Sequence, residues 1–155
     1  MRRKDREVCD LQEILEIIDE CKVCRIGFCD EGKVYIVPVN FGYKFEDGKL
    51  VLYVHGARAG YKYEVLAKNP LVGFEMDCEH ELVKADVACG YGYRFASVIG
   101  NGEAEVVTDV GEKREALGIL MKHQTGGEFV FGEKEAASVT VMKVTSEQFT
   151  AKRRK

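Results

Sequence analysis

Two short turn sequences between β-rich segments constrain the fold of this chain most. "DEGK" at 30–33 and "EDGK" at 46–49 each place an acidic residue directly before glycine. Apolar and β-branched runs surround them: "KVCRIGFC" precedes the first, "VYIVPVNFGYKF" joins the two, and "LVLYV" follows the second. Acidic residue–glycine pairs accept the left-handed backbone of tight hairpin turns. The pattern therefore predicts consecutive antiparallel strands.

Three further strands are expected later in the chain, at 71–77, 94–107 and 138–150. The "GNG" sequence inside the second of them predicts a bend. Pro38 cannot donate a hydrogen bond to a neighbouring strand, so its strand is expected at a sheet edge or a bulge. About six antiparallel strands in sequence tend to curl into a small barrel, because closure removes unpaired edges.

Two or three short helices are expected beside these strands. Asp10 can cap an amphipathic helix over 10–20. The segment 61–68 predicts a second helix, which the following Asn-Pro sequence ends. Thr108 is predicted to cap a third helix over 109–127, which a glycine pair closes. The charge-rich stretch "EHELVKAD" that starts at Glu79 is expected to be a solvated loop or a lid.

Length and charge restrict the class of protein. The 155 residues fit a single domain over 1–155. A net charge of -3 argues against a nucleic-acid-binding protein, because binding phosphate backbones requires an excess of basic residues. Basic residues do cluster at 1–6 and 151–155. We interpret these as solvated tails, with an arm that reaches a bound anion as the alternative.

The cellular location and the cysteines follow from the same composition. No window is apolar enough for a membrane span, and no apolar segment follows the first charges as in a signal peptide. We therefore expect a cytoplasmic protein whose six cysteines are reduced thiols. Cys21-x-x-Cys24 and Cys78-x-His80 could suggest zinc, but no second closely spaced pair completes a ligand set. We expect no metal.

The stretch "VHGARAGYK" at 54–62 is the candidate site. Gly56 and Gly60 permit tight turns and close approach of a ligand. The free amides at the start of the following helix carry partial positive charge, and Arg58 and Lys62 add full charges. The segment is thus either an anion site at a helix start or only a polar turn.

Three sequence blocks in order carry a family resemblance. "VPVNFGY" at 37–43, "LYVHGARAGYK" at 52–62 and "FASVIGNGEAEVV" at 95–107 resemble the FMN-binding split-barrel family. Within it, the nitroimidazole-resistance branch, which is related to pyridoxamine 5'-phosphate oxidase, is the most similar. The resemblance covers roughly residues 5–150. It implies a mainly β fold, a six-stranded antiparallel split barrel with flanking helices, and a homodimer with two FMN sites at its interface.

The resemblance also implies which residues contact FMN. Residues 38–40 would line the flavin ring through their backbone, and residues 55–57 would pass close to the ring and the ribityl chain. Gly60 and Lys62 match the phosphate end, and residues 97–98 match a strand that also approaches the cofactor. The full set of candidates is Pro38, Val39, Asn40, Tyr43, His55, Gly56, Ala57, Gly60, Lys62, Ser97 and Val98.

The implied activity is that of a flavin-dependent oxidoreductase. Electrons would pass from a reduced nicotinamide, NAD(P)H, to a small acceptor such as a nitroimidazole. His55 is the candidate catalytic residue, as a proton donor or a group that orients the acceptor, and a turn histidine bonded to backbone is its alternative. For His123 we favour a structural role at a helix end. The alternative functions are a non-catalytic flavin- or haem-binding sensor and an interaction module with an empty pocket.

Overall fold

The computed structural model of the chain describes residues 3–155, so the first two residues of the basic N-terminal segment lie outside it. The secondary structure is mainly β, as predicted. The strands are β1 (Glu7–Val8), β2 (Val23–Asp30), β3 (Lys33–Asn40), β4 (Gly42–Glu46), β5 (Lys49–Gly56), β6 (Leu71–Val83), β7 (Gly92–Val107) and β8 (Thr140–Arg154). The helices are η1 (Lys4–Arg6), α1 (Leu11–Glu20), α2 (Tyr61–Lys68), η2 (Ala88–Gly90), α3 (Val110–Thr125) and α4 (Glu133–Ser138).

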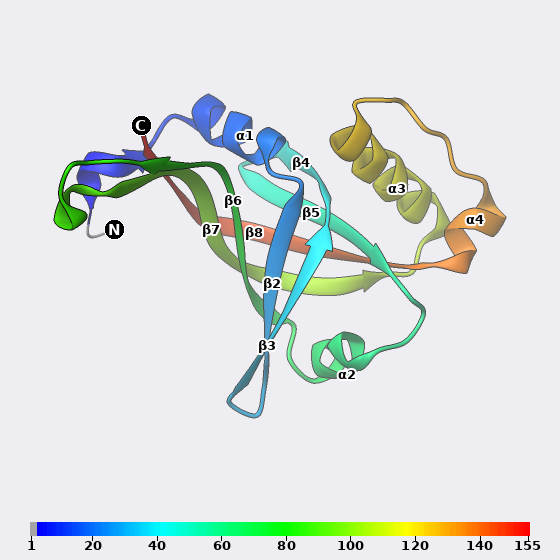
Figure 1. Ribbon diagram of the computed structural model, residues 1–155. Coiled ribbons are helices and arrows are strands. Elements are labelled where there is room, and N and C mark those ends of the chain that lie inside the picture. Colours follow the sequence, from blue (N-terminus) through cyan, green and yellow to red (C-terminus); the bar gives the residue numbers. More distant parts are fainter. Residues whose placement is uncertain (1–2) are drawn as a thin grey trace.

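The strands form one curled antiparallel sheet in the order β3-β2-β6-β7-β8-β5-β4, with β1 added to β8. The long strands β7 and β8 pair along the barrel, and the helices lie outside it (Figure 1). The split barrel predicted from the sequence is confirmed. The sheet has eight strands rather than six because the predicted run 34–45 divides at Phe41 and because the short β1 joins β8.

The two predicted hairpin turns have the backbone that their sequences require. Glu31 and Gly32 have φ angles of 51° and 86°, and Asp47 and Gly48 have φ angles of 52° and 78°. In each hairpin the residues on either side of these two pair with each other across the strands. Positive φ at both central residues defines the turn whose twist matches antiparallel strands.

The predicted helices 10–20 and 61–68 are present, and one predicted cap is wrong. Asp10 accepts a hydrogen bond from the Glu13 amide at 2.9 Å, as an N-cap residue does. At α3, however, Asp109 rather than Thr108 accepts from the Glu112 amide, at 2.8 Å. Both threonine and aspartate can cap a helix. Because α3 begins at Val110, the residue directly before it, Asp109, is the cap. The short helix α4 was not predicted as a separate element.

Two segments expected to be loop or tail belong to the sheet. β6 continues to Val83 after a register shift between Cys78 and Glu81, so the first part of "EHELVKAD" is strand rather than loop or lid. β8 continues to Arg154, and Ala151 in it is only 1% exposed, so the C-terminal basic segment is not a solvated tail. Pairing with a long neighbouring strand stabilises these segments despite their charged side chains.

β5 shows why one of the apolar runs is continuous rather than alternating. Leu50, Leu52 and Val54 face the barrel interior, where they join the main hydrophobic core. Val51 and Tyr53 face the opposite way, into a second cluster beneath α3 and α4. Because both faces of β5 are covered, every position from 50 to 54 is buried. The main core thus fills the barrel, and the second cluster attaches the two helices to its outside.

Pro38 lies in β3, which is at one end of the strand order, so the predicted edge position is confirmed. None of the helices in residues 3–155 is both long and apolar enough to cross a membrane.

Candidate functional site

The end of β5 and the start of α2 form a small cationic cradle, which we define as residues 55–63. Lys62 folds back across the end of the strand. A Cβ atom built on Gly56 would lie 2.8 Å from Lys62 Nζ and 3.0 Å from the Tyr63 hydroxyl. The Lys62 ammonium also lies 4.8 Å from the centre of the Tyr63 ring. Glycine at position 56 therefore leaves room for the lysine side chain.

The first turn of α2 is open to a ligand. Gly60 precedes the helix with φ 155° and ψ 159°, a backbone conformation that is almost restricted to glycine. No side chain caps this helix start, and a Cβ at Gly60 would have no atom within 4 Å. Within residues 3–155 Lys62 forms no ion pair with a carboxylate. Free amides and an unpaired ammonium together make an anion site, which favours the cradle over a polar turn.

Arg58, the other cation of the cradle, holds the loop in place. Its Nη2 donates to the Ala137 carbonyl at 2.8 Å and its Nε donates to the Ser138 carbonyl at 3.3 Å. These carbonyls lie at the C-terminal end of α4, where a cation is favourable. No local pattern in the sequence indicates this role. The partners lie about 80 residues away along the chain and belong to a helix that was not predicted.

His55 is exposed on β5 opposite Val141, directly before Gly56. The other two histidines each have a partner: His80 lies 2.7 Å from Asp77, and His123 lies 2.8 Å from the Cys21 carbonyl. Among the described residues the His55 ring has no such partner. It is therefore free to contact a ligand beside the cradle, as is the exposed Ala57.

The segment 38–40 lies on β3, which packs close to β5. The Asn40 side chain is used within the chain: its Nδ2 donates to the Lys22 carbonyl at 3.0 Å and to Gln124 Oε1 at 3.3 Å. Pro38 is exposed, and Val39 packs against the main core. Only the backbone of Val39 and Asn40 is thus left for a ligand, which is the contact that the resemblance implies for this segment.

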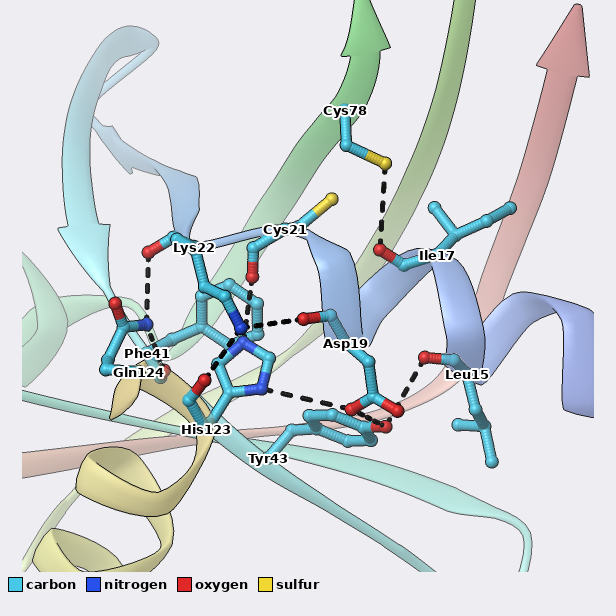
Figure 2. A network of polar contacts seen from close by, with 10 residues as sticks. All are labelled: Leu15, Ile17, Asp19, Cys21, Lys22, Phe41, Tyr43, Cys78, His123 and Gln124. Carbon is cyan, nitrogen blue, oxygen red and sulfur yellow. Dashed lines mark hydrogen bonds and ion pairs between the residues drawn. The ribbon is translucent and has the colours of Figure 1, made fainter. Parts of the chain in front are cut away.

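Tyr43 takes part in a network beneath α1 rather than in the cradle (Figure 2). Its hydroxyl donates to Asp19 Oδ1 at 2.8 Å, and the edge of its ring meets His123 at a centroid distance of 5.5 Å. Burial, followed by the nearby Asp19 carboxylate, raises the pKa of Tyr43. The side chain of Tyr43 is thus engaged in this network rather than in the cradle.

His123 joins the C-terminal ends of α1 and α3 in the same network (Figure 2). Its side chain is 5% exposed, and Nε2–H donates to the carbonyl of Cys21, the residue that caps α1. Lys22 Nζ donates to the His123 carbonyl at 2.7 Å. Burial holds the pKa of His123 below its usual value. The expected role at a helix end is present, although the helix is α1 rather than its own.

Ser97 and Val98 lie far from the cradle. Ser97 is ten residues before Val107 on β7, and Val107 pairs with Val141, the residue opposite His55. At roughly 3.3 Å per residue this is about 30 Å of strand. Figure 1 shows the two ends of β7 on opposite sides of the molecule, near the chain termini and near α4. Val98 also faces the core.

A large hollow lies on the outer face of the sheet. It is an open, mostly apolar groove of about 1030 Å³ between β2, β6 and β7. No residue of the cradle lines it, and its shape is that of a surface rather than an enclosed pocket. Val34 and Ile36, which line it from β3, are 71% and 60% exposed.

The cysteines and the last arginines have structural environments. Cys21 and Cys24 are buried, and burial raises the pKa of the Cys24 thiol to about 12. Arg153 donates to Glu79 at 2.6 Å and to Glu13 at 2.6 Å, which ties β8 to β6 and α1. An arm that reaches an anion is therefore the wrong interpretation for Arg153.

The chain is similar to known proteins in both sequence and fold. The sequence profile of the pyridoxamine 5'-phosphate oxidase family matches residues 10–153. A proposed 5-nitroimidazole antibiotic resistance protein from Bacteroides thetaiotaomicron is 36% identical, with a TM-score of 0.81 over 95% of this chain and 86% of that chain. A search of curated protein sequences finds no significant match.

Two more distant structures share the fold. A flavocytochrome from Azotobacter vinelandii is 22% identical, with a TM-score of 0.78 over 100% of this chain and 72% of that chain. An FAD- and haem-binding protein from Mycobacterium smegmatis is 17% identical, with a TM-score of 0.80 over 97% of this chain and 74% of that chain.

Proposed function

The chain belongs to the pyridoxamine 5'-phosphate oxidase family, and from this membership we propose that it is an FMN-binding oxidoreductase. In this proposal it reduces a small acceptor, such as a nitroimidazole, with electrons from a reduced nicotinamide. The observation that carries the proposal is the cradle at the end of β5. There an uncapped helix start meets Lys62, which has no carboxylate partner among residues 3–155.

The residues of the cradle fit the phosphate end of FMN. Lys62 supplies a full positive charge, and the free amides of the first turn of α2 supply hydrogen-bond donors. Gly56 and Gly60 keep the space in front of these donors free of side chains. Arg58 contributes by fixing the loop to α4, so that the donors keep their positions without help from the ligand.

FMN, when bound, supplies two-electron redox chemistry that no side chain of the protein provides. The protein binds and orients it. The backbone of 38–40 on the neighbouring edge strand would line the ring, and His55 would donate a proton to the acceptor or orient it. The ring of His55 is exposed at the end of β5 and has no partner in the described part of the chain, which supports this assignment.

A homodimer with two sites would reconcile the predicted contacts. Ser97 lies about 30 Å along β7 from Val107, the end of that strand nearest His55. One cofactor can therefore meet both residues only if they belong to different chains. The apolar groove with Val34 and Ile36 is a suitable surface for a second copy. The 36% identical protein from Bacteroides thetaiotaomicron, with its proposed link to 5-nitroimidazole, suggests nitroheterocycles as the first acceptors to test.

The first experiment is the visible absorption spectrum of the purified protein, recorded before and after addition of FMN and again after gel filtration. We expect flavin bands that stay with the protein, that bleach on addition of a reduced nicotinamide, and that return with a nitroimidazole. A protein that remains colourless with added FMN would refute the proposal. Retained flavin without bleaching would favour the non-catalytic sensor, and haem bands would favour a haem-binding protein.

His55→Ala separates catalysis from binding. We expect the variant to keep FMN and to reduce the acceptor about 100-fold or more slowly, because loss of a general acid costs roughly that much. Equal loss of FMN and activity would instead make His55 part of the flavin scaffold.

A further inference from the structure

A second hollow, lined by charged and aromatic side chains, lies on the outer face of β6 and β7 and is about 510 Å³ in volume. The hollow lies toward the start of β7, whereas the other end of β7, at Val107, is the end nearest the cradle of the same chain. It is noteworthy because it contains Ser97, one of the predicted cofactor contacts. Its lining residues are Glu75, Asp77, His80, Tyr93, Phe95 and Ser97.

A chain of charged hydrogen bonds orients His80 in this hollow. His80 Nε2 lies 2.7 Å from Asp77 Oδ2, and Arg25 Nη1 donates to Asp77 Oδ1 at 2.6 Å. A carboxylate on one ring nitrogen fixes both the tautomer and the orientation of an imidazole. Nε2 therefore carries hydrogen, and Nδ1 is the nitrogen left to exchange a proton with a ligand.

The charges around the hollow indicate what it can bind. Arg25 also donates to Glu75 at 3.1 Å, so one cation faces two carboxylates. Burial, followed by repulsion from Asp77, raises the pKa of Glu75. With a surplus of acidic groups the hollow disfavours an anionic ligand. Tyr93 and Phe95 add aromatic walls, which suit a flat, uncharged molecule.

We infer that His80 is a second proton-transfer residue of the proposed oxidoreductase, provided by one chain to the site whose cradle and His55 belong to the other chain. Asp77 and Arg25 act as positioning residues for it. The ligand is a small, uncharged aromatic acceptor with a reducible oxygen, such as a nitro compound, and not a phosphate ester. The inference rests on the proposed function.

The reaction needs one proton that the reduced nicotinamide does not supply, and His80 can donate it. Reduction of an aromatic nitro group to a nitroso group takes up two electrons and two protons and releases one water. Both electrons and one proton originate in the reduced nicotinamide. His80 donates the other proton from Nδ1 to the oxygen that leaves as water, and solvent then restores the proton on Nδ1. In this step His55 orients the acceptor and donates no proton.

NMR of the imidazoles tests binding without turnover. The chain contains three histidines, so three single substitutions assign every ring signal. We would add 5-nitroimidazole to the oxidised, FMN-loaded protein in the absence of any reductant. We expect the chemical shifts of the His80 ring to change on addition of 5-nitroimidazole, both in wild type and in His55→Ala. Unchanged His80 signals at a concentration that saturates the acceptor rate would overturn the inference.

Kinetics test the chemical role. His80→Gln should lower kcat about 100-fold or more while FMN retention stays unchanged, as for loss of a general acid. Asp77→Asn should lower kcat less and alter its pH profile, because it disturbs the orientation of the ring rather than removing it. Glu81→Gln, on the same strand and outside the hollow, is the matched control and should match wild type. A kcat of His80→Gln within about twofold of wild type would contradict the inference.

Mixed dimers test whether the two histidines come from different chains. In a dimer of one His55→Ala chain and one His80→Gln chain, one site keeps both histidines if they meet across the interface. We then expect about half of the wild-type activity, whereas neither parent dimer is active. If the mixed dimer recovered no activity, the two histidines would not meet across the interface, and the inference would be wrong. Failure of wild type to retain FMN would refute the proposed function itself and this inference with it.

Discussion

The two cations of the cradle differ in what they are free to bind. Arg58 donates hydrogen bonds to the Ala137 and Ser138 carbonyls. The Lys62 ammonium lies over Gly56 and Tyr63 and has no carboxylate partner within residues 3–155. A cation that already has two acceptors has little left to offer a phosphate. The affinity for an anion should therefore depend directly on the charge of Lys62. Arg58 should affect it only indirectly, by holding the loop of the cradle in position.

Lys62→Ala should weaken FMN binding about 10- to 100-fold, because a hydrogen bond to a charged group contributes about 1.5–3 kcal/mol. Fluorescence titration of FMN into the apoprotein measures the change. Lys68→Ala is a suitable control, because Lys68 lies on the same helix and pairs with Asp30 at 3.3 Å. Equal affinity of wild type and Lys62→Ala would remove Lys62 from the phosphate site.

Two glycines illustrate how the same substitution can affect binding or folding. Gly56→Ala would place a methyl group against the movable end of Lys62, whereas Gly42→Ala would overlap the Leu120 backbone of α3. We expect the first change to weaken FMN binding with little loss of stability. The second should lower the free energy of unfolding by about 1–3 kcal/mol, as overpacking does. Urea unfolding and FMN titration of both variants check this, and reversed effects would contradict it.

At the scale of elements, the network under α1 holds the helices against the barrel. His123 and Gln124, at the end of α3, bond to the Cys21 and Lys22 carbonyls after α1. Gln124 Nε2 also donates to the Phe41 carbonyl at 2.8 Å, between β3 and β4. Asn40, at the end of β3, donates hydrogen bonds to Lys22 and Gln124 of this network. The network therefore also fixes the end of β3 that would contact the proposed flavin ring.

The buried imidazole of His123 predicts a pH dependence of stability. Burial lowers the pKa of His123 in the folded state, so the unfolded chain binds the proton more tightly. Its contribution to stability is complete above the unfolded pKa of about 6.5 and is lost as the pH falls toward the folded pKa. Urea unfolding between about pH 7.5 and about pH 5.5 should show a smaller decline for His123→Gln than for wild type.

His55→Gln serves as the control for that series, since it removes an exposed ring that has no partner among the described residues. It should follow the wild-type curve. If His123→Gln followed the wild-type curve as well, the pH dependence would have to come from other groups.

At the scale of the whole molecule, the exposed apolar groove is the feature that a single chain does not explain. Val34 and Ile36 stand on an edge strand beside the groove and are among the most exposed aliphatic side chains that the structure describes. A second copy would cover them, and it would also bring Ser97 and His80 of one chain toward the cradle of the other. The proposed dimer and the proposed site are therefore linked.

Ile36→Glu should convert the dimer to a monomer, because a buried, unpaired carboxylate opposes association. The monomer should also lose FMN, since each site would lack its second chain. Sedimentation velocity with detection of flavin absorbance measures both. Val130→Glu, at a side chain that is 91% exposed on the loop before α4, should remain a dimer with FMN. A wild-type protein that is already monomeric would refute the dimer.

The sequence by itself determined the features that depend on neighbouring residues. The hairpin turns at 30–33 and 46–49, the helix at 61–68 and the glycines of the cradle follow from backbone preferences within a few positions. The family resemblance added the split barrel, because three blocks in order identify a fold that no single block would. These parts of the prediction therefore rest either on short-range backbone preferences or on the resemblance to the family.

The tertiary structure decided what depends on residues far apart in the chain. It assigned Arg58 to the carbonyls of α4, extended β6 past Cys78, and paired β8 up to Arg154. It also placed Ser97 ten residues along β7 from Val107, the end of that strand nearest His55. Strand pairing and side-chain contacts between residues far apart in the chain leave no periodic signal in the sequence, so only the folded chain shows which groups meet.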